Sequence, residues 1–187
     1  MANKDAAFGL KAIGKVGQNR DNQGLSEYGI AASSTAIYQN DPIMMAATGK
    51  IVVGTAAAVL LGSLNGVFFT DATTGKPTYA NHLNASNTAT DIVGFVSDDP
   101  YERFEVQSDG ATAAADVGMN ADIVYAAGSS PDYVSKVELD HSDLKTATAQ
   151  LRVLAISNDI ENNEAGSANV NLVVMINEHF LKGTVGV

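Results

Sequence analysis

The amino-acid sequence predicts a mostly β protein: an antiparallel β-barrel or β-sandwich with an extended N-terminal arm and at most one or two short helices. Short runs rich in β-branched residues alternate with polar positions, and Gly, Asn, Asp, Ser and Thr interrupt these runs at short intervals. About nine or ten strands fit between the turns. The sequence has no repeat of fixed period, which disfavours a solenoid or a propeller.

The length of 187 residues suffices for one domain with a core, or for one domain with an arm. The chain has no cysteine, which excludes disulfides, thiolate metal sites and cysteine nucleophiles. No apolar run reaches the roughly 20 residues that span a bilayer, and residues 1–5 lack the hydrophobic region of a secretion signal. We therefore expect a protein made in a cytoplasm that contacts no membrane.

Residues 1–35 are expected to form the extended arm, and residues 36–187 the barrel or sandwich body. Glycine recurs every few residues in the arm, which discourages the interiors of helices and strands. Isolated hydrophobic side chains lie between the glycines, and we expect them to pack on a surface of the same subunit, of a neighbouring subunit or of a larger lattice. These anchors are Phe8, Leu10, Ile13 and Tyr28. A disordered tail is the alternative, which the anchors disfavour.

Turn residues separate the strands expected in the body. A strand at 36–40 ends before Pro42, which moves the preceding residue out of the helical region. Asn65-Gly66 lies between hydrophobic runs and predicts a two-residue hairpin turn, because both residues tolerate a positive φ. Pro77 predicts the first residue of a strand, or an edge strand. Further strands are expected at 50–53, 57–61, 67–70, 78–80, 92–96, 103–107, 122–126, 133–139, 150–157 and 169–177.

Alternation predicts which strand faces are buried. Phe104 and Val106 share one face of their strand. The closing strand places four hydrophobic residues on one face: Val170, Leu172, Val174 and Ile176. One short helix is expected over 111–115, where alanines favour helix, Asp109 is placed to cap it and Gly118 to stop it.

The formal charge of −10 is unevenly distributed. Residues 1–24 hold four basic and two acidic groups, a net of +2, which leaves seven basic and nineteen acidic groups, a net of −12, for the rest. Binding to nucleic acid needs lysine and arginine at the phosphates, so we expect no direct contact of the acidic body with DNA or RNA. The basic segment could meet an acidic protein surface, or its charge could be accidental.

The residues typical of catalysis are few and do not form a recognisable motif. His141 and His179 are expected to be solvated loop residues, and His82 lies in a polar loop. The acidic stretch 159–164 offers oxygen ligands for Ca²⁺, although its turn residues explain it more simply. The sequence has no phosphate-binding loop, nucleophile elbow or dinucleotide fingerprint. We therefore expect no enzyme, no cofactor and no metal site.

Several stretches resemble one known family. Residues 151–159 and 168–179 form a pair of hydrophobic runs around a polar turn that contains glycine. This pair resembles the closing β-hairpin of the head decoration (cement) proteins of tailed bacteriophages. The stretches 51–61, 93–96 and 116–122 also look like the small β-barrel domains of that family, in which a Val-Gly loop positions the next strand.

The resemblance implies a virion protein on the exterior of the capsid, where it stabilises the shell. It implies the major capsid protein as partner, assembly as a homotrimer or homodimer, and no catalytic residue. Phe8, Leu10, Ile13 and Tyr28 would then bind the capsid or a neighbouring subunit, and deletion of 1–35 should weaken attachment while the body stays folded. Two alternatives stay open: another virion component, such as a tail, fibre or baseplate module, and a carbohydrate-binding adhesin. The absence of tryptophan and the scattered positions of Tyr and Phe disfavour sugar binding.

Overall fold

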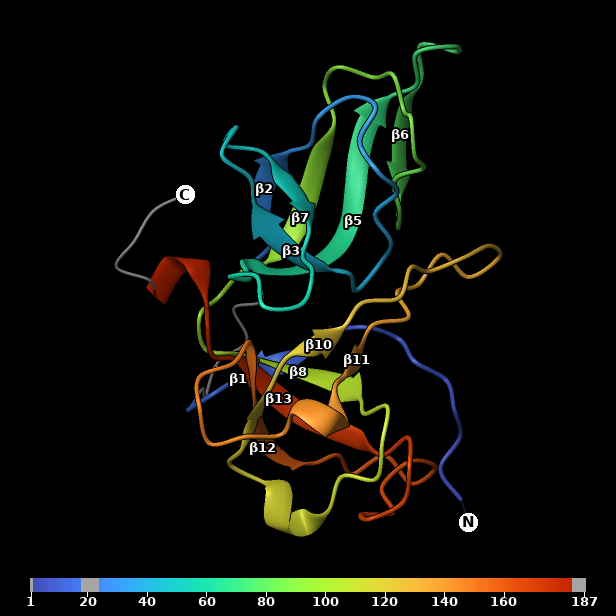
Figure 1. The fold of residues 1–187 in the computed structure, drawn as a ribbon. Coiled ribbons are helices and arrows are strands. Elements are labelled where there is room, and N and C mark those ends of the chain that lie inside the picture. Colours follow the sequence, from blue (N-terminus) through green and yellow to red (C-terminus); the bar gives the residue numbers. More distant parts are fainter. Residues whose placement is uncertain (1, 18–23, 183–187) are drawn as a thin grey trace.

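The strands fold into two lobes that lie one above the other in Figure 1. The computed structural model describes residues 2–17 and 24–182; residues 24–97 form the upper lobe, and residues 2–17 and 98–182 the lower lobe. The strands are β1 (Lys11–Lys15), β2 (Ser26–Gly29), β3 (Pro42–Met45), β4 (Ile51–Val53), β5 (Gly62–Thr70), β6 (Pro77–Ala80), β7 (Val93–Ser97), β8 (Glu102–Gln107), β9 (Asn120–Ala121), β10 (Ile123–Val124), β11 (Glu138–Leu139), β12 (Leu151–Ile156) and β13 (Asn171–Ile176). The 3₁₀ turns are η1 (Ala114–Asp116), η2 (His141–Asp143) and η3 (Phe180–Lys182).

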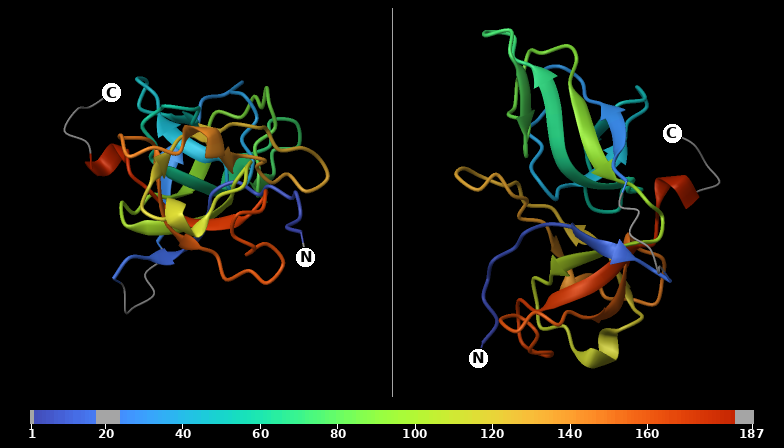
Figure 2. Two further views of the ribbon diagram at one scale, coloured as in Figure 1. Left: turned by 60° about the horizontal axis from the view of Figure 1, so that its bottom comes forward. Right: turned by 180° about the vertical axis from the view of Figure 1, so that it is seen from behind.

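The upper lobe is an antiparallel sheet with the strand order β2-β7-β5-β3-β4, and β6 pairs with β5. A bridge between Ile30 and Ile51 links the two ends of this order, so the sheet curves around its core. The core residues are almost completely buried, and they include Ile37, Leu64 and Val96. Figure 2 shows the β5–β6 hairpin at the end of this lobe that points away from the lower lobe.

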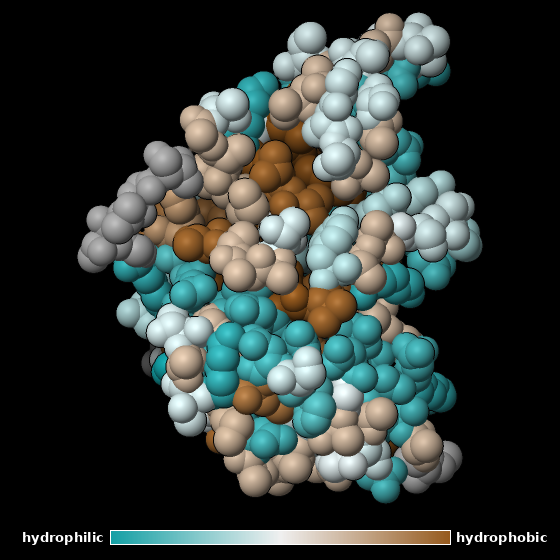
Figure 3. Space-filling model, in the orientation of Figure 1, coloured by the Kyte–Doolittle hydropathy of each residue, from teal (hydrophilic) through white to brown (hydrophobic). Residues whose placement is uncertain are grey.

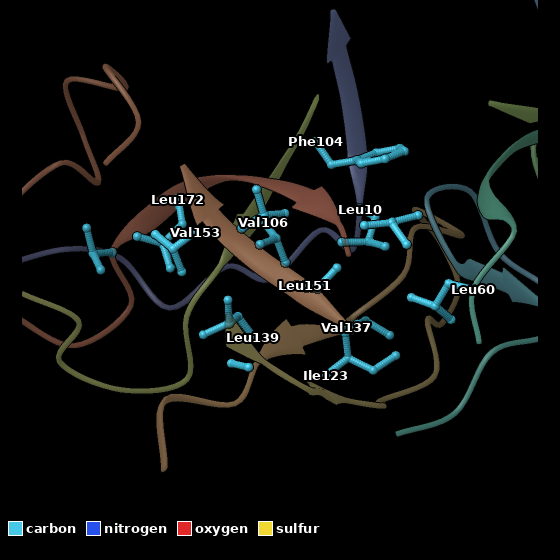
Figure 4. Packing of buried hydrophobic residues seen from close by; sticks show 14 residues of the cluster. Leu10, Leu60, Phe104, Val106, Ile123, Val137, Leu139, Leu151, Val153 and Leu172 are labelled. Atoms are coloured by element: carbon cyan, nitrogen blue, oxygen red, sulfur yellow. The ribbon is translucent and has the colours of Figure 1, made fainter. Parts of the chain in front are cut away.

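The lower lobe contains the antiparallel sheet β1-β8-β13-β12-β9 and the short pair β10–β11. The predicted faces of β8 and β13 are confirmed: Phe104, Val106, and the alternate residues from Val170 to Ile176 are buried. Phe104 is the largest completely buried side chain of this core. Figure 4 shows that Leu10 and Leu60 enter the same cluster from segments outside the central strands.

The mostly β, antiparallel fold class is confirmed, and the two sheets pack in a sandwich-like way without forming a closed barrel. The helix expected over 111–115 is instead the single 3₁₀ turn η1. Asp109 does not cap it, because its carboxylate accepts the backbone N–H of His141 at 2.8 Å. The side chain of Asp116 accepts the N–H of Ala113 at 2.8 Å instead.

The N-terminal segment differs from the expected arm. β1 adds a strand to the lower sheet beside β8, and β2 adds a strand to the upper sheet beside β7. Residues 18–23 of the expected arm lie outside the described residues. One of the glycines serves close packing: Gly9 has a φ of 74°, and a Cβ atom there would lie 2.4 Å from the carbonyl oxygen of Asn40. The division at residue 35 therefore does not separate an arm from a body.

The hairpin predicted at Asn65-Gly66 is wrong. β5 runs through both residues, and neither has a positive φ. In the pairing with β7, Leu64 lies opposite Val96 and Gly66 opposite Phe95, so Asn65 is the extra residue of a β-bulge. The expected strands at 36–40 and 57–61 are also absent from the described fold, because regular pairing begins at Pro42 and Gly62.

Several contacts join the lobes, and those of Leu60 and Gln150 are buried. Leu60 belongs to the upper lobe by sequence but is buried in the lower core, and its N–H donates to the carbonyl oxygen of Glu178 at 3.1 Å. Gln150 of the lower lobe is completely buried. Its Nε2 donates to the carbonyl oxygens of Thr55 at 2.8 Å and Ala58 at 2.7 Å. These contacts fix the position of one lobe on the other.

Candidate functional site

The four predicted anchors do not form one surface. Leu10 is completely buried in the lower core, and Phe8 is half-buried. Tyr28 packs against the upper core, and its hydroxyl donates to Asp98 at 2.6 Å. Burial, together with this hydrogen bond, raises the pKa of Tyr28 to about 12. Ile13 is 39% exposed and is the only one of the four anchors that is exposed.

A β-bulge explains the exposure of Ile13. In the pairing of β1 with β8, Ala12 lies opposite Phe104 and Gly14 opposite Arg103, so Ile13 is the extra residue. A bulge re-aims a side chain and strengthens the local twist. Val16 follows on the same segment and is 48% exposed. Within the described chain, β1 is the last strand of its sheet, and β8 is the one strand that pairs with it.

A second candidate surface lies on the outer face of the upper lobe, where three aromatic rings gather. Tyr79 of β6 is 75% exposed. Its ring centroid lies 4.8 Å from that of Phe68 on β5, with an angle of 49° between the planes. The ring of Phe95 on β7 is stacked with Tyr79 at 6.4 Å and 17°. These rings are distant in the sequence, and the register of three strands brings them together.

The bulge in β5 leaves space beside these rings. Cross-strand partners point to the same face of a sheet, so Gly66 is on the outer face opposite Phe95. Glycine has no side chain to cover the Phe95 ring, and a Cβ atom at Gly66 would lie 3.0 Å from the carbonyl oxygen of Ala80. The extra residue, Asn65, is exposed beside the same space. Asn65-Gly66, which the sequence predicted to be a turn, instead lines a groove.

The groove has a volume of about 390 Å³ and an uncharged lining. Its lining residues are Gln39, Asn65, Gly66, Val67, Tyr79, Ala80, Asn81 and Phe95. Three of them carry amide groups. Among the described residues, neither the Asn65 amide nor the Nε2 of Gln39 has a hydrogen-bond partner. The groove therefore offers an aromatic wall and unpaired amide groups. We define these eight residues as the aromatic groove.

The histidines lie in three separate places. His82 stacks on Tyr133, with ring centroids 3.8 Å apart and an angle of 4° between the planes, and its Nδ1 is 2.8 Å from Oδ1 of Asn81. Burial lowers the pKa of His82. His141 is half-buried at the start of η2. The expectation that His179 is solvated is wrong: it is 3% exposed because β13 leads it into the junction of the lobes, and burial lowers its pKa to about 4.

The acidic stretch 159–164 binds the N-terminal segment of the same chain. Lys4 donates its N–H to Oδ1 of Asn162 at 2.9 Å, and its ammonium lies 2.6 Å from the carboxylate of Glu161. Asp159 accepts a hydrogen bond from Nδ2 of Asn171 at 2.9 Å. In residues 2–17 and 24–182, no three His, Cys, Asp or Glu side chains are arranged to hold a metal ion.

The described part of the chain contains no helix that is long and apolar enough to cross a membrane. Comparison with protein-family models, curated proteins and solved structures found no match. The function is therefore inferred from the two surfaces of the chain itself, the β1 edge and the aromatic groove.

Proposed function

We propose that this chain is a non-enzymatic structural protein of a tailed-phage virion, bound to the outer surface of the capsid as a decoration protein. The observation that carries the proposal is the β1 edge with its exposed Ile13 and Val16. A free strand edge can bind an extended segment of a partner through main-chain hydrogen bonds, while adjacent side chains give specificity. The major capsid protein is the partner that we propose.

The position of β1 in its sheet supports this proposal. The two runs that resemble the closing hairpin of decoration proteins form β12 and β13, and β13 is joined to β1 through β8. The resembling hairpin and the β1 edge thus belong to one sheet. A short edge makes a modest interface, but a repeated capsid lattice multiplies such interfaces by avidity, and closed homo-oligomers such as trimers or dimers add to it.

The charge distribution favours a place outside the shell. The chain carries a net charge of −10, and its basic groups are enriched in the segment that contains β1. Packaged nucleic acid repels an acidic surface, so the exterior is the side of the capsid on which this body experiences least repulsion. Figure 3 shows that hydrophilic residues cover most of the visible face of the lower lobe, whereas the upper lobe presents more hydrophobic surface.

Co-sedimentation with empty heads of the phage that encodes the chain tests the proposal. We expect the double variant Ile13→Asp/Val16→Asp to bind at least about tenfold more weakly, because two carboxylates at the edge oppose docking of an apolar strand. Val117→Asp is the matched control, since Val117 is 41% exposed near η1 and away from β1. Circular dichroism checks that both variants are folded. Failure of the native chain to sediment with heads, or equal occupancy by all three proteins, contradicts the proposal.

A further inference from the structure

We propose that the aromatic groove on the outer face of β5, β6 and β7 is a binding site for a neutral sugar ring. The groove combines an exposed tyrosine face with three amide side chains and contains no charged side chain. This site is separate from the β1 edge, because it belongs to the other sheet. The inference therefore goes beyond capsid binding and does not depend on it.

The aromatic wall fits the apolar face of a sugar. Several C–H groups of a pyranose point to one side of the ring, and an aromatic face with its negative quadrupole is a favourable partner for them. Tyr79 is 75% exposed, so its ring is available for such stacking. Phe68 of the paired strand β5 packs against it, and the ring of Phe95 on β7 lies beyond Phe68 with its centroid 6.4 Å from that of Tyr79.

The amide groups fit the hydroxyl groups of a sugar. A hydroxyl both donates and accepts hydrogen bonds, and an amide side chain offers an NH₂ donor and a carbonyl acceptor. Asn65 and Gln39 provide such groups without partners among the described residues. Asn81 supplies a third amide, whose Nδ2 makes long hydrogen bonds of 3.5 Å to Gln39 and 3.4 Å to the carbonyl oxygen of Asp132.

The absence of charge in the groove lining selects against ionic ligands. A phosphate or a sugar acid needs lysine or arginine nearby, and the lining has neither. Glu27 of β2 lies opposite Phe95 in the strand register and is exposed, so a negative ligand would meet a carboxylate beyond the groove. The net charge of −10 also disfavours a negative ligand. A neutral saccharide meets none of these obstacles.

The groove is largely preformed. Oδ1 of Asn81 is held 2.8 Å from Nδ1 of His82, whose ring stacks on Tyr133. The bulge fixes Asn65, and the missing side chain at Gly66 keeps the space open. A site built before the ligand arrives loses less entropy on binding. The volume of about 390 Å³ lies at the lower end of ligand pockets, which suits one sugar ring of a longer glycan.

Saturation-transfer difference NMR on the full chain tests this site with methyl glucoside, methyl galactoside, methyl mannoside and N-acetylglucosamine, and with glucuronate as the anionic comparison. We expect at least one neutral probe to bind with a Kd on the order of 1 mM and glucuronate to bind more weakly. Tyr79→Ala should weaken binding at least about tenfold, and Asn65→Ala about threefold or more. Tyr101→Ala is the control, because Tyr101 is a 58% exposed tyrosine outside the groove.

Dispersed methyl resonances in the same spectra show whether each variant is folded, and Asn65→Ala changes an exposed side chain in any case. Three results would overturn the site: no transfer from any neutral probe to the native chain, equal transfer in the native chain and folded Tyr79→Ala, or preference for glucuronate. Self-association that depends on Tyr79 without sugar binding would identify a second copy as the occupant and would also overturn it. None of these results bears on sedimentation with heads, so the sugar site and the capsid proposal can each be refuted without the other.

Discussion

At the scale of single residues, amide side chains replace the backbone pairing that the first residues of the chain lack. Lys4 and Ala6 belong to no strand, yet their backbone groups have partners. Gln107 donates from Nε2 to the carbonyl oxygen of Lys4 at 3.0 Å and accepts the N–H of Ala6 at 2.9 Å. Asn162 also donates from Nδ2 to the oxygen of Lys4, at 2.8 Å. These amides bind the N-terminal segment to the lower lobe.

The neighbouring residues Asn162 and Asn163 provide a matched test of this role. Asn162 is 4% exposed, whereas Asn163 is exposed. Asn162→Ala leaves the N–H of Lys4 without its acceptor, and we expect it to lower the free energy of unfolding by about 1–3 kcal/mol. Asn163→Ala should change it by less than about 0.5 kcal/mol. Urea denaturation measures both values, and equal effects would contradict the role of the buried amide.

The completely buried Asp41 predicts a pH dependence. Burial raises its pKa from 3.8 to about 6, and hydrogen bonds from Ser135 and from the Tyr38 N–H partly oppose this. Between these two values the native state holds a proton that the unfolded chain has released, so the free energy of unfolding falls as the pH rises. Asp41→Asn should therefore be more stable than the native chain near pH 7, by about 2–3 kcal/mol.

Thermal unfolding between pH 3 and pH 8 checks this expectation, and the advantage of Asp41→Asn should vanish toward pH 3. Asp91→Asn is the control, and its effect on stability should have the opposite sign: it should be less stable than the native chain near pH 7. Hydrogen bonds from Thr70 lower the pKa of Asp91 and stabilise its charged form, which the amide lacks. A constant difference between Asp41→Asn and the native chain at all pH values would show that charge at this position does not matter.

At the scale of elements, alternation predicted β8 and β13, but the alternating stretch 133–139 forms only the two-residue β11, and local turn chemistry at Asn65-Gly66 was misleading. The strands at 103–107 and 169–177 form with the expected faces, because alternation alone defines which side is buried. Asn65-Gly66 fails as a turn because β5 gains ladders to β7 and β6 by continuing through it. The aromatic groove could not be predicted, since it depends on the register of three strands. The clue in the sequence was the pair Phe68-Phe69: adjacent side chains of a strand point to opposite faces, so one of the two rings faces outward.

Leu10 tests whether the N-terminal element belongs to the lower core. It is completely buried beside Phe104 in that cluster, so Leu10→Ala should lower the free energy of unfolding by about 2–5 kcal/mol. Leu25→Ala is the control, because Leu25 is 41% exposed in the same segment of the sequence. Urea denaturation of both variants measures the difference. If Leu10→Ala is as stable as the native chain, Leu10 does not contribute to the lower core.

At the scale of the whole molecule, the upper lobe is an insertion in the lower lobe. β1 precedes it and β8 follows it, and these two strands pair with each other. Lys15 at the end of β1 lies 2.7 Å from the carboxylate of Asp99, and Val16 donates its N–H to the carbonyl oxygen of Tyr101 at 2.9 Å. The chain therefore enters and leaves the upper lobe at neighbouring points of the lower lobe. The lobe with the β1 edge and the lobe with the aromatic groove are structurally distinct.

This insertion has a consequence for how such a chain can diversify. Because the entry and exit of residues 24–97 are adjacent, a different small β module could be spliced at the same point without altering the order of strands below it. Among the contacts that the incoming module would have to replace are an aliphatic side chain in the place of Leu60 and carbonyl oxygens within reach of Gln150. A graft that omitted either would leave a hole or an unmatched amide in its host.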